Sequence, residues 1–62
     1  MEFTIIDITN PDGVHDRVCS SLRALYDLTD VQQDDEMVKL ANLKPGEEYI
    51  LFSYRFKIVR DA

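Results

Sequence analysis

The closing segment of the chain, residues 48–60, alternates hydrophobic residues with residues of mixed character. A period of two residues is typical of a β-strand, because successive side chains point to opposite faces. We therefore predict one long strand with a hydrophobic face toward the core and a second face that is partly hydrophobic and partly basic. The predicted core face carries Ile50, Phe52, Tyr54, Phe56 and Ile58. The mixed face carries Tyr49, Leu51, Ser53, Arg55, Lys57 and Val59.

The first segment, residues 2–9, is also predicted to be a strand. It is rich in isoleucine and threonine, and hydrophobic residues fall on both of its faces. We therefore expect a central strand or one that is covered twice. Asn10-Pro11-Asp12-Gly13 follows and suits a turn, with proline at the second position and glycine at the fourth. The same residues can begin a helix with Asn10 or Asp12 as its N-cap.

Residues 14–26 are predicted to form an amphipathic helix. Hydrophobic residues recur there at spacings of three and four, which places them on one helix face. They are Val14, Val18, Leu22, Leu25 and Tyr26.

Residues 27–36 hold five acidic residues and no basic one, and they allow two interpretations. The segment is either a loop or the start of a short helix, capped by Thr29 or Asp30, that continues to Leu40. The alternation in residues 37–42 favours a strand, which we prefer. Lys44-Pro45-Gly46-Glu47 then suits a type II turn, because proline occupies the second position and glycine the third.

These elements predict a single small α+β domain over residues 1–62, with the order β-α-β-β. One amphipathic helix would pack on a three-stranded sheet that ends in a C-terminal hairpin. A domain of this size buries little surface, so its stability depends on good packing or on a partner. The predicted core is Ile6, Ile8, Val18, Leu22, Leu25, Tyr26, Val38, Leu40, Ile50, Phe52, Tyr54, Phe56 and Ile58.

The charge of the chain is unevenly distributed. The formal net charge is −5, with nine acidic and two basic side chains in residues 1–36, and three acidic and five basic ones in residues 37–62. A net negative charge disfavours nonspecific binding to nucleic acids and to anionic membranes. Hydrophobic runs of only a few residues exclude a membrane-spanning helix. One cysteine, Cys19, and no visible signal peptide predict a cytoplasmic protein.

No catalytic motif is recognisable. His15 and Cys19 would share a face of the predicted helix, but nothing in the sequence supplies the further ligands or orienting group that a metal site or a nucleophile needs. We interpret them as a surface histidine beside a half-buried cysteine. The acidic segment lacks the ligand spacing of a calcium loop, and neither glycine lies in a phosphate-binding motif. We expect no enzymatic activity, no metal and no cofactor.

The remaining hypothesis is a protein-binding module: a small acidic adaptor or inhibitor of a larger protein with a basic surface. A chain of this size and type fits an accessory protein of a phage or another mobile element. The expected partner-binding residues come from the acidic segment and from the mixed face of the closing strand. They are Asp27, Asp30, Asp34, Asp35, Glu36, Tyr49, Leu51, Arg55 and Lys57.

Two alternatives stay open. The acidic segment could imitate the phosphates of a nucleic acid and occupy a DNA- or RNA-binding groove. Alternatively, Arg55, Lys57 and Arg60 could bind a nucleic acid directly, although only Tyr49 would provide a stacking ring on that face. A homodimer is compatible with all three hypotheses, because the strand edges and the mixed face need cover.

Overall fold

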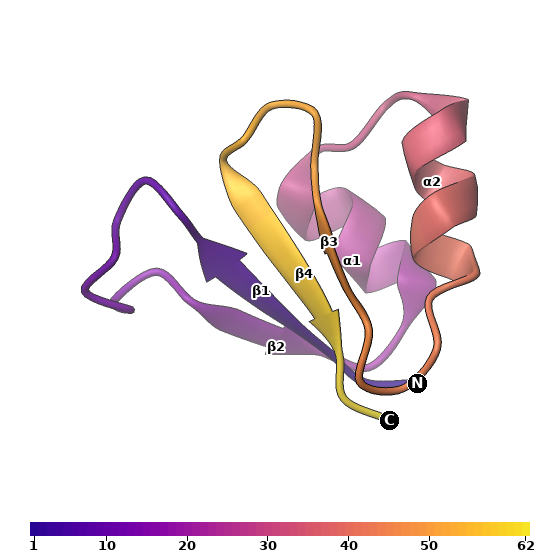
Figure 1. Ribbon diagram of the computed structural model, residues 1–62, viewed down its shortest axis with the longest axis horizontal. Coiled ribbons are helices and arrows are strands. Elements are labelled where there is room, and N and C mark those ends of the chain that lie inside the picture. Colours follow the sequence, from indigo (N-terminus) through magenta and orange to yellow (C-terminus); the bar gives the residue numbers. More distant parts are fainter.

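The computed structural model describes residues 1–62 and confirms a small α+β domain (Figure 1). Four antiparallel strands form one sheet in the order β2-β1-β4-β3, and two helices accompany it. Figure 1 shows α1 behind the sheet and α2 beside β3. The elements are β1 (Phe3–Asp7), β2 (Arg17–Cys19), α1 (Leu22–Thr29), α2 (Asp34–Ala41), β3 (Glu48–Ile50) and β4 (Phe56–Arg60).

The first strand is confirmed as a central strand. β1 pairs with β2 on one side and with β4 on the other. Phe3, Ile5 and Asp7 are buried and face the helices, while the residues between them are only half-buried. The prediction that Ile6 and Ile8 face the core is therefore wrong: the opposite face of this strand is the covered one.

The hydrophobic core lies between the sheet and the two helices. It consists of Phe3, Ile5, Cys19, Leu25, Leu40, Leu43, Leu51 and Ile58. Three members of the predicted core are thus fully confirmed, and Leu22, Tyr26 and Phe56 pack partly buried against them. The others lie on the surface or, like Ile6, on the outer side of the sheet. The exposed ones are Ile8, Val18, Val38, Ile50, Phe52 and Tyr54.

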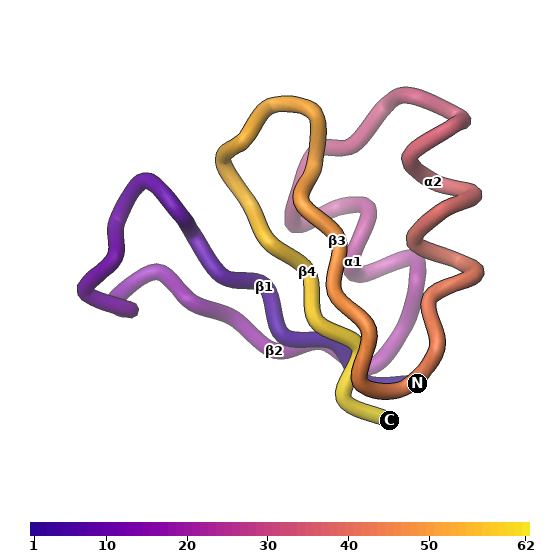
Figure 2. The backbone as a smooth tube through the Cα atoms, viewed as in Figure 1, coloured from indigo at the N-terminus to yellow at the C-terminus, as the bar shows by residue number.

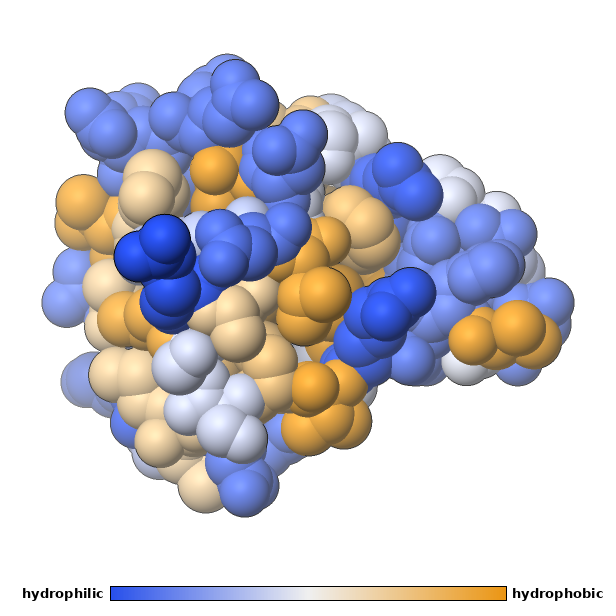
Figure 3. Space-filling view, turned by 180° about the vertical axis from the view of Figure 1, so that it is seen from behind, coloured by the Kyte–Doolittle hydropathy of each residue, from blue (hydrophilic) through white to orange (hydrophobic).

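The predicted helix over residues 14–26 is wrong in its first half. Residues 17–19 pair with β1 instead, and the helix begins only after Ser21. The Ser21 hydroxyl accepts a hydrogen bond from the backbone N–H of Ala24 at 3.1 Å, which satisfies a free donor of the first turn. The projecting β1–β2 connection is mostly hydrophilic, as the right side of Figure 3 shows. Strand pairing and a serine cap therefore override the helical spacing that begins at Val14.

The preferred strand over residues 37–42 is also wrong, because this segment belongs to α2. The helical alternative is the better one, although its N-cap is Gln33 rather than Thr29 or Asp30. Three acidic residues occupy the first turn of α2 and Lys39 lies in its last turn. Both placements favour the helix through its dipole. The two-helix, four-stranded fold replaces the predicted helix on three strands.

The turn after α2 is confirmed. The backbone N–H of Glu47 donates to the Lys44 carbonyl at 2.9 Å, and Gly46 has a φ of 89°, as the third position of a type II turn requires. Neither helix of the protein is long and apolar enough to cross a membrane.

The long closing strand is in fact two strands, β3 and β4, with a tight reversal between them. Figure 2 shows the chain folding back on itself in this region. The Tyr54 N–H donates to the Leu51 carbonyl at 2.8 Å, and the Leu51 N–H donates to the Phe56 carbonyl at 3.1 Å. The C-terminal hairpin therefore lies inside the segment predicted as one strand. Its turn carries Phe52 and Tyr54 out to solvent.

Candidate functional site

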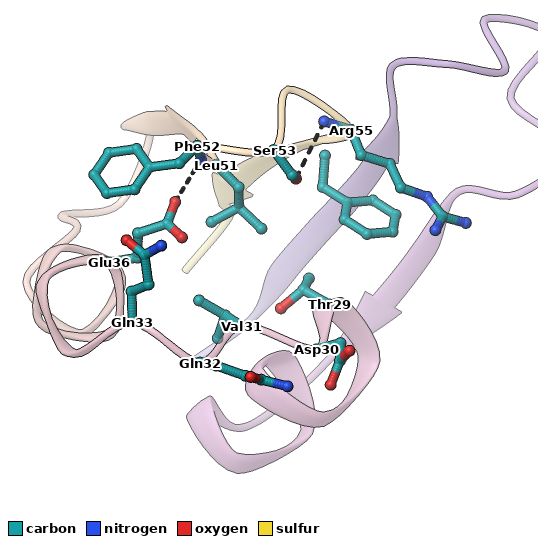
Figure 4. A pocket seen from close by; sticks show the side chains of 11 residues that line it. Thr29, Asp30, Val31, Gln32, Gln33, Glu36, Leu51, Phe52, Ser53 and Arg55 are labelled. Carbon is teal, nitrogen blue, oxygen red and sulfur yellow. Dashed lines mark hydrogen bonds between the residues drawn. The ribbon is translucent and has the colours of Figure 1, made fainter.

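A cleft of about 580 Å³ separates the α1–α2 loop from the β3–β4 turn (Figure 4). One wall consists of residues 29–33 together with Glu36, and the other of residues 51–53, 55 and 56. Leu51 points into the cleft between the two walls, whereas the ring of Phe52 points outward from it. The cleft is therefore hydrophobic at its base and polar along its rims.

A hydrogen bond joins the two walls. The Glu36 carboxylate accepts a hydrogen bond from the backbone N–H of Phe52 at 2.5 Å, and only 6% of the Glu36 residue is exposed. Glu36 is the third residue of α2, where the helix dipole favours a negative charge. The hairpin turn leaves the Phe52 N–H without a backbone acceptor, and the helix supplies one through Glu36. This hydrogen bond sets the distance between the two walls of the cleft.

The β3–β4 turn exposes two aromatic rings. Phe52 is 49% exposed and Tyr54 is 76% exposed. Tyr54 has a φ of 57°, in the left-handed region, where a side chain with a Cβ costs roughly 1–2 kcal/mol. Glycine or asparagine ordinarily occupies such a position. The tip of the turn therefore combines backbone strain with an exposed tyrosine ring.

Arg55 lies beside these rings. Its guanidinium carbon is 4.9 Å from the centre of the Phe56 ring, and no carboxylate lies within ion-pair distance of it. An arginine stacked on a ring keeps its fork of donors free for another group. We call Phe52, Tyr54 and Arg55 the turn tip.

Acidic residues lie in and next to the opposite wall: Asp30 lines the cleft, whereas Asp34 and Asp35 lie beside it. Asp30 ends α1 in a left-handed conformation, and Asp34 and Asp35 form the first turn of α2. All three are exposed and none forms an ion pair. We call these three residues the acidic corner. The corner lies at the upper left of Figure 3, where hydrophilic residues gather. Asp27 is different, because it pairs with Arg23 at 3.6 Å on the exposed side of α1.

A second hollow, of about 370 Å³, lies on the other side of Arg55. Asp7, His15 and Arg17 contribute to its lining. Hydrogen bonds from the Thr9 hydroxyl, chiefly, and from Asn10 and the Thr9 backbone hold the pKa of Asp7 below its ordinary value, despite the opposing effect of burial. The positive charge of Arg55 lowers this pKa further. The Asp7 carboxylate is thus occupied by hydrogen bonds that stabilise the loop following β1.

The predicted mixed face does not exist as one surface. Tyr49 lies opposite Ile58 on the inner side of the sheet, and Leu51, which is 3% exposed, belongs to the core. Lys57 lies opposite Ile50 on the outer side. The four-residue turn shifts the alternation by one position, so even-numbered residues face inward in β4 and odd-numbered ones in β3. The expectation that Leu51 and Glu36 are surface residues is wrong.

Tyr49 is half-buried beneath Lys39, whose ammonium lies 5.8 Å from the ring centre. Its hydroxyl is buried without a hydrogen-bond partner. Burial, and then the charges of Glu36 and Asp35, raise the pKa of this phenol. Tyr49 therefore supports the wall of the cleft from within, rather than offering a ring to a ligand.

His15 and Cys19 do not form a pair on a helix. His15 lies in the β1–β2 connection and is exposed, whereas Cys19 ends β2 with its side chain buried. Burial raises the pKa of the Cys19 thiol, which makes it a poor nucleophile. The structure contains no group of three or more residues that could hold a metal ion.

Phe52 and Tyr54 are the surface residues that the sequence pattern missed. A strand of thirteen residues is much longer than the usual five or six, which is the signal that residues 48–60 contain a turn.

Comparison with known proteins adds nothing to this: no family model, no curated protein and no solved structure matches the chain. The function is therefore inferred from the chemistry of the cleft and its rims.

Proposed function

We propose that this protein is a non-enzymatic binding module, an acidic adaptor or inhibitor. It binds a larger protein through the two rims of its cleft. The observation that carries the proposal is Tyr54, a 76% exposed aromatic residue held in a left-handed conformation. Strained residues of this kind persist where the surrounding structure imposes them, and they cluster at functional sites. A turn selected for stability alone would place glycine or asparagine there.

The composition of the turn tip supports binding to a protein. Tyrosine and arginine are enriched among the residues that contribute most to protein interfaces. Both rims are ordered before binding, because Glu36 holds the Phe52 N–H and the Tyr54 N–H bonds the Leu51 carbonyl. A preorganised surface loses little conformational entropy on association, which favours affinity.

The acidic corner indicates the chemistry of the partner. Asp30, Asp34 and Asp35 have no ion-pair partner within the molecule, so their charge is available to a basic surface. Complementary charge raises the association rate and the selectivity more than the final affinity. We infer a partner that presents a hydrophobic pocket for Tyr54 beside lysine or arginine side chains.

The polar groups of the cleft support binding rather than catalysis. Ser53 carries the one aliphatic hydroxyl in the turn, and its oxygen accepts a hydrogen bond from the Arg55 N–H at 3.4 Å. A serine needs an adjacent base to act as a nucleophile. His15, the single histidine, borders the other hollow.

Imitation of nucleic acid is the second candidate, favoured by the three unpaired carboxylates of the acidic corner. The two candidates differ in what Tyr54 does. A mimic depends on carboxylates alone, so replacing Tyr54 would leave its binding intact. A module of the kind that we propose loses most of its affinity with the ring.

The test is affinity capture from the source cell with the tagged full chain, followed by titration of the captured protein. Four proteins are compared: wild type, Tyr54→Gly, the double variant Asp34→Asn with Asp35→Asn, and Val14→Ser as a control. Val14 is 73% exposed but lies in the β1–β2 connection. We expect Tyr54→Gly to bind at least tenfold more weakly, the double variant to bind more weakly and with less dependence on salt, and the control to bind as wild type does. Equal binding by wild type and Tyr54→Gly would overturn the proposal.

A further inference from the structure

Glu36 is a buried charge in the wall of the cleft, and the chain gives it no cationic partner. Only 6% of the residue is exposed, and its Oε2 accepts the hydrogen bond from the Phe52 N–H. Its Oε1 makes no hydrogen bond within the chain, and it is not a fully buried atom, because the Tyr49 hydroxyl is the only buried side-chain group without a partner. Both ion pairs of the protein involve other residues. A buried carboxylate ordinarily has a cation beside it, because burial removes the water that stabilises its charge.

Two basic side chains lie near the cleft without pairing with Glu36. The ammonium of Lys39 lies over the Tyr49 ring, 5.8 Å from its centre. The guanidinium of Arg55 lies over the Phe56 ring, and Figure 4 shows it directed away from the wall that carries Glu36. A cation for the free oxygen of Glu36 would therefore come from outside the chain.

The rest of the cleft suits the long side chain of an arginine. Leu51 and Val31 provide an apolar base on which its methylene groups can lie. Asp30 adds an unpaired carboxylate to the same wall as Glu36, and Gln33 adds an amide oxygen. A guanidinium carries five donors in one plane and is more weakly hydrated than an ammonium. Several oxygens around a partly desolvated space therefore favour arginine over lysine.

We propose that the cleft receives one arginine side chain of the partner protein, whose guanidinium pairs with Oε1 of Glu36 and with the carboxylate of Asp30. This inference rests on the proposed function and adds the residue that the partner places between the two rims. Charge-assisted hydrogen bonds are among the strongest in proteins, and a site with little water strengthens them further. The buried carboxylate then gains the counter-charge that the chain itself does not supply.

Titration of N-acetylarginine methylamide into the isotopically labelled full chain, followed by amide NMR shifts, tests the proposal without the partner. N-acetylcitrulline methylamide has nearly the same shape without the charge, and N-acetyllysine methylamide has the charge without the planar fork of donors. We expect saturable shifts at the cleft amides, including those of Val31 and Phe52, with a dissociation constant on the order of millimolar for the arginine compound. The other two compounds should bind more weakly. Shifts outside the cleft alone, or equal binding by the citrulline or the lysine compound, would overturn the proposal.

Two variants and a matched control locate the contact. Glu36→Gln and Asp30→Asn each remove one charge with little change in shape, and asparagine tolerates the left-handed conformation of residue 30. We expect Glu36→Gln to bind the arginine compound about tenfold more weakly, and Asp30→Asn, at an exposed position, to show a smaller loss. Glu2→Gln makes the same change as Glu36→Gln on an exposed residue outside the cleft and should bind as wild type does. The amide spectrum of each variant shows that it is folded, and unchanged binding by either cleft variant would contradict the assignment.

The captured partner separates this inference from the proposed function. A partner that loses affinity for Tyr54→Gly but not for Glu36→Gln would leave the binding module standing and overturn the arginine contact. A partner that is indifferent to Tyr54→Gly, while the arginine compound binds in the cleft as expected, would overturn the role of the turn tip alone.

Discussion

The Glu36 carboxylate accepts a hydrogen bond from the backbone N–H of Phe52 at 2.5 Å, across sixteen residues of sequence. The bond joins the first turn of α2 to the β3–β4 turn. It is made by a carboxylate that is 6% exposed and by a backbone donor that the hairpin leaves free. The bond therefore connects the two rims of the cleft directly.

Replacing Glu36 should uncouple these rims. Glu36→Ala leaves the Phe52 N–H without its acceptor, and we expect a loss of about 1.5–3 kcal/mol in the free energy of unfolding. Glu36→Gln keeps an oxygen at the same place and should lose less. Urea denaturation measures both, with the exposed Glu2→Gln as control. Stabilities equal to wild type for the alanine variant would show that the bond contributes nothing.

Replacing Tyr54 should separate binding from stability. Tyr54→Gly removes the left-handed strain, worth roughly 1–2 kcal/mol, at the expense of a more flexible unfolded chain. We expect the variant to be at least as stable as wild type in urea while its binding falls. Tyr54→Asn, which tolerates the same conformation, should behave alike. A marked destabilisation by both variants would mean that the ring packs structurally.

Tyr49→Phe should stabilise the domain by about 1 kcal/mol, because it removes a buried hydroxyl that has no partner. The raised pKa of Tyr49 also predicts that the folded protein loses stability at alkaline pH. A phenol whose pKa is higher in the folded chain favours folding below its ordinary value of 10.0, and this contribution disappears as the pH rises through the folded-state pKa. The wild type should therefore lose stability above about pH 10 more steeply than Tyr49→Phe. Parallel profiles in thermal melts would contradict this assignment.

Asp7 should give the opposite dependence, at acid pH. Its folded-state pKa is lowered, chiefly by the Thr9 hydroxyl, so its contribution to stability is present above the ordinary value of 3.8 and is lost as the pH falls through the folded-state pKa. Asp7→Asn should lower stability at neutral pH and flatten the decline in acid. Melts from pH 7 downward measure this, with the exposed Glu2→Gln as control. An unchanged acid profile for Asp7→Asn would count against the Thr9 hydrogen bonds.

Local chemistry predicted some parts of this fold well. The first strand and the Pro45-Gly46 turn depend on neighbouring residues alone, and both are confirmed, although the buried face of the strand is the opposite of the predicted one. The segment from Val14 to Cys19 was mispredicted because its hydrophobic spacing suits a helix, whereas its pairing with β1 is a tertiary contact. Pairing between segments overrides local propensity and leaves no periodic trace.

The site was predicted in part for the same reason. The acidic corner is a run in the sequence, so its density was visible without a structure. The turn tip was hidden, because Phe52 and Tyr54 continue the alternation of Ile50 as if no turn intervened. The reversal changes which face each side chain occupies, and the hydrogen bond from Glu36 that supports it comes from a distant helix.

Photo-crosslinking from the turn tip tests the central claim most directly. A benzoylphenylalanine placed at position 54 of the full chain, and in a matched protein at position 14, is irradiated in extract of the source cell. We predict a discrete protein adduct from position 54 that excess unlabelled wild type suppresses and excess Tyr54→Gly does not, with no such adduct from position 14. Equal adducts from both positions, or none from position 54, would contradict the account.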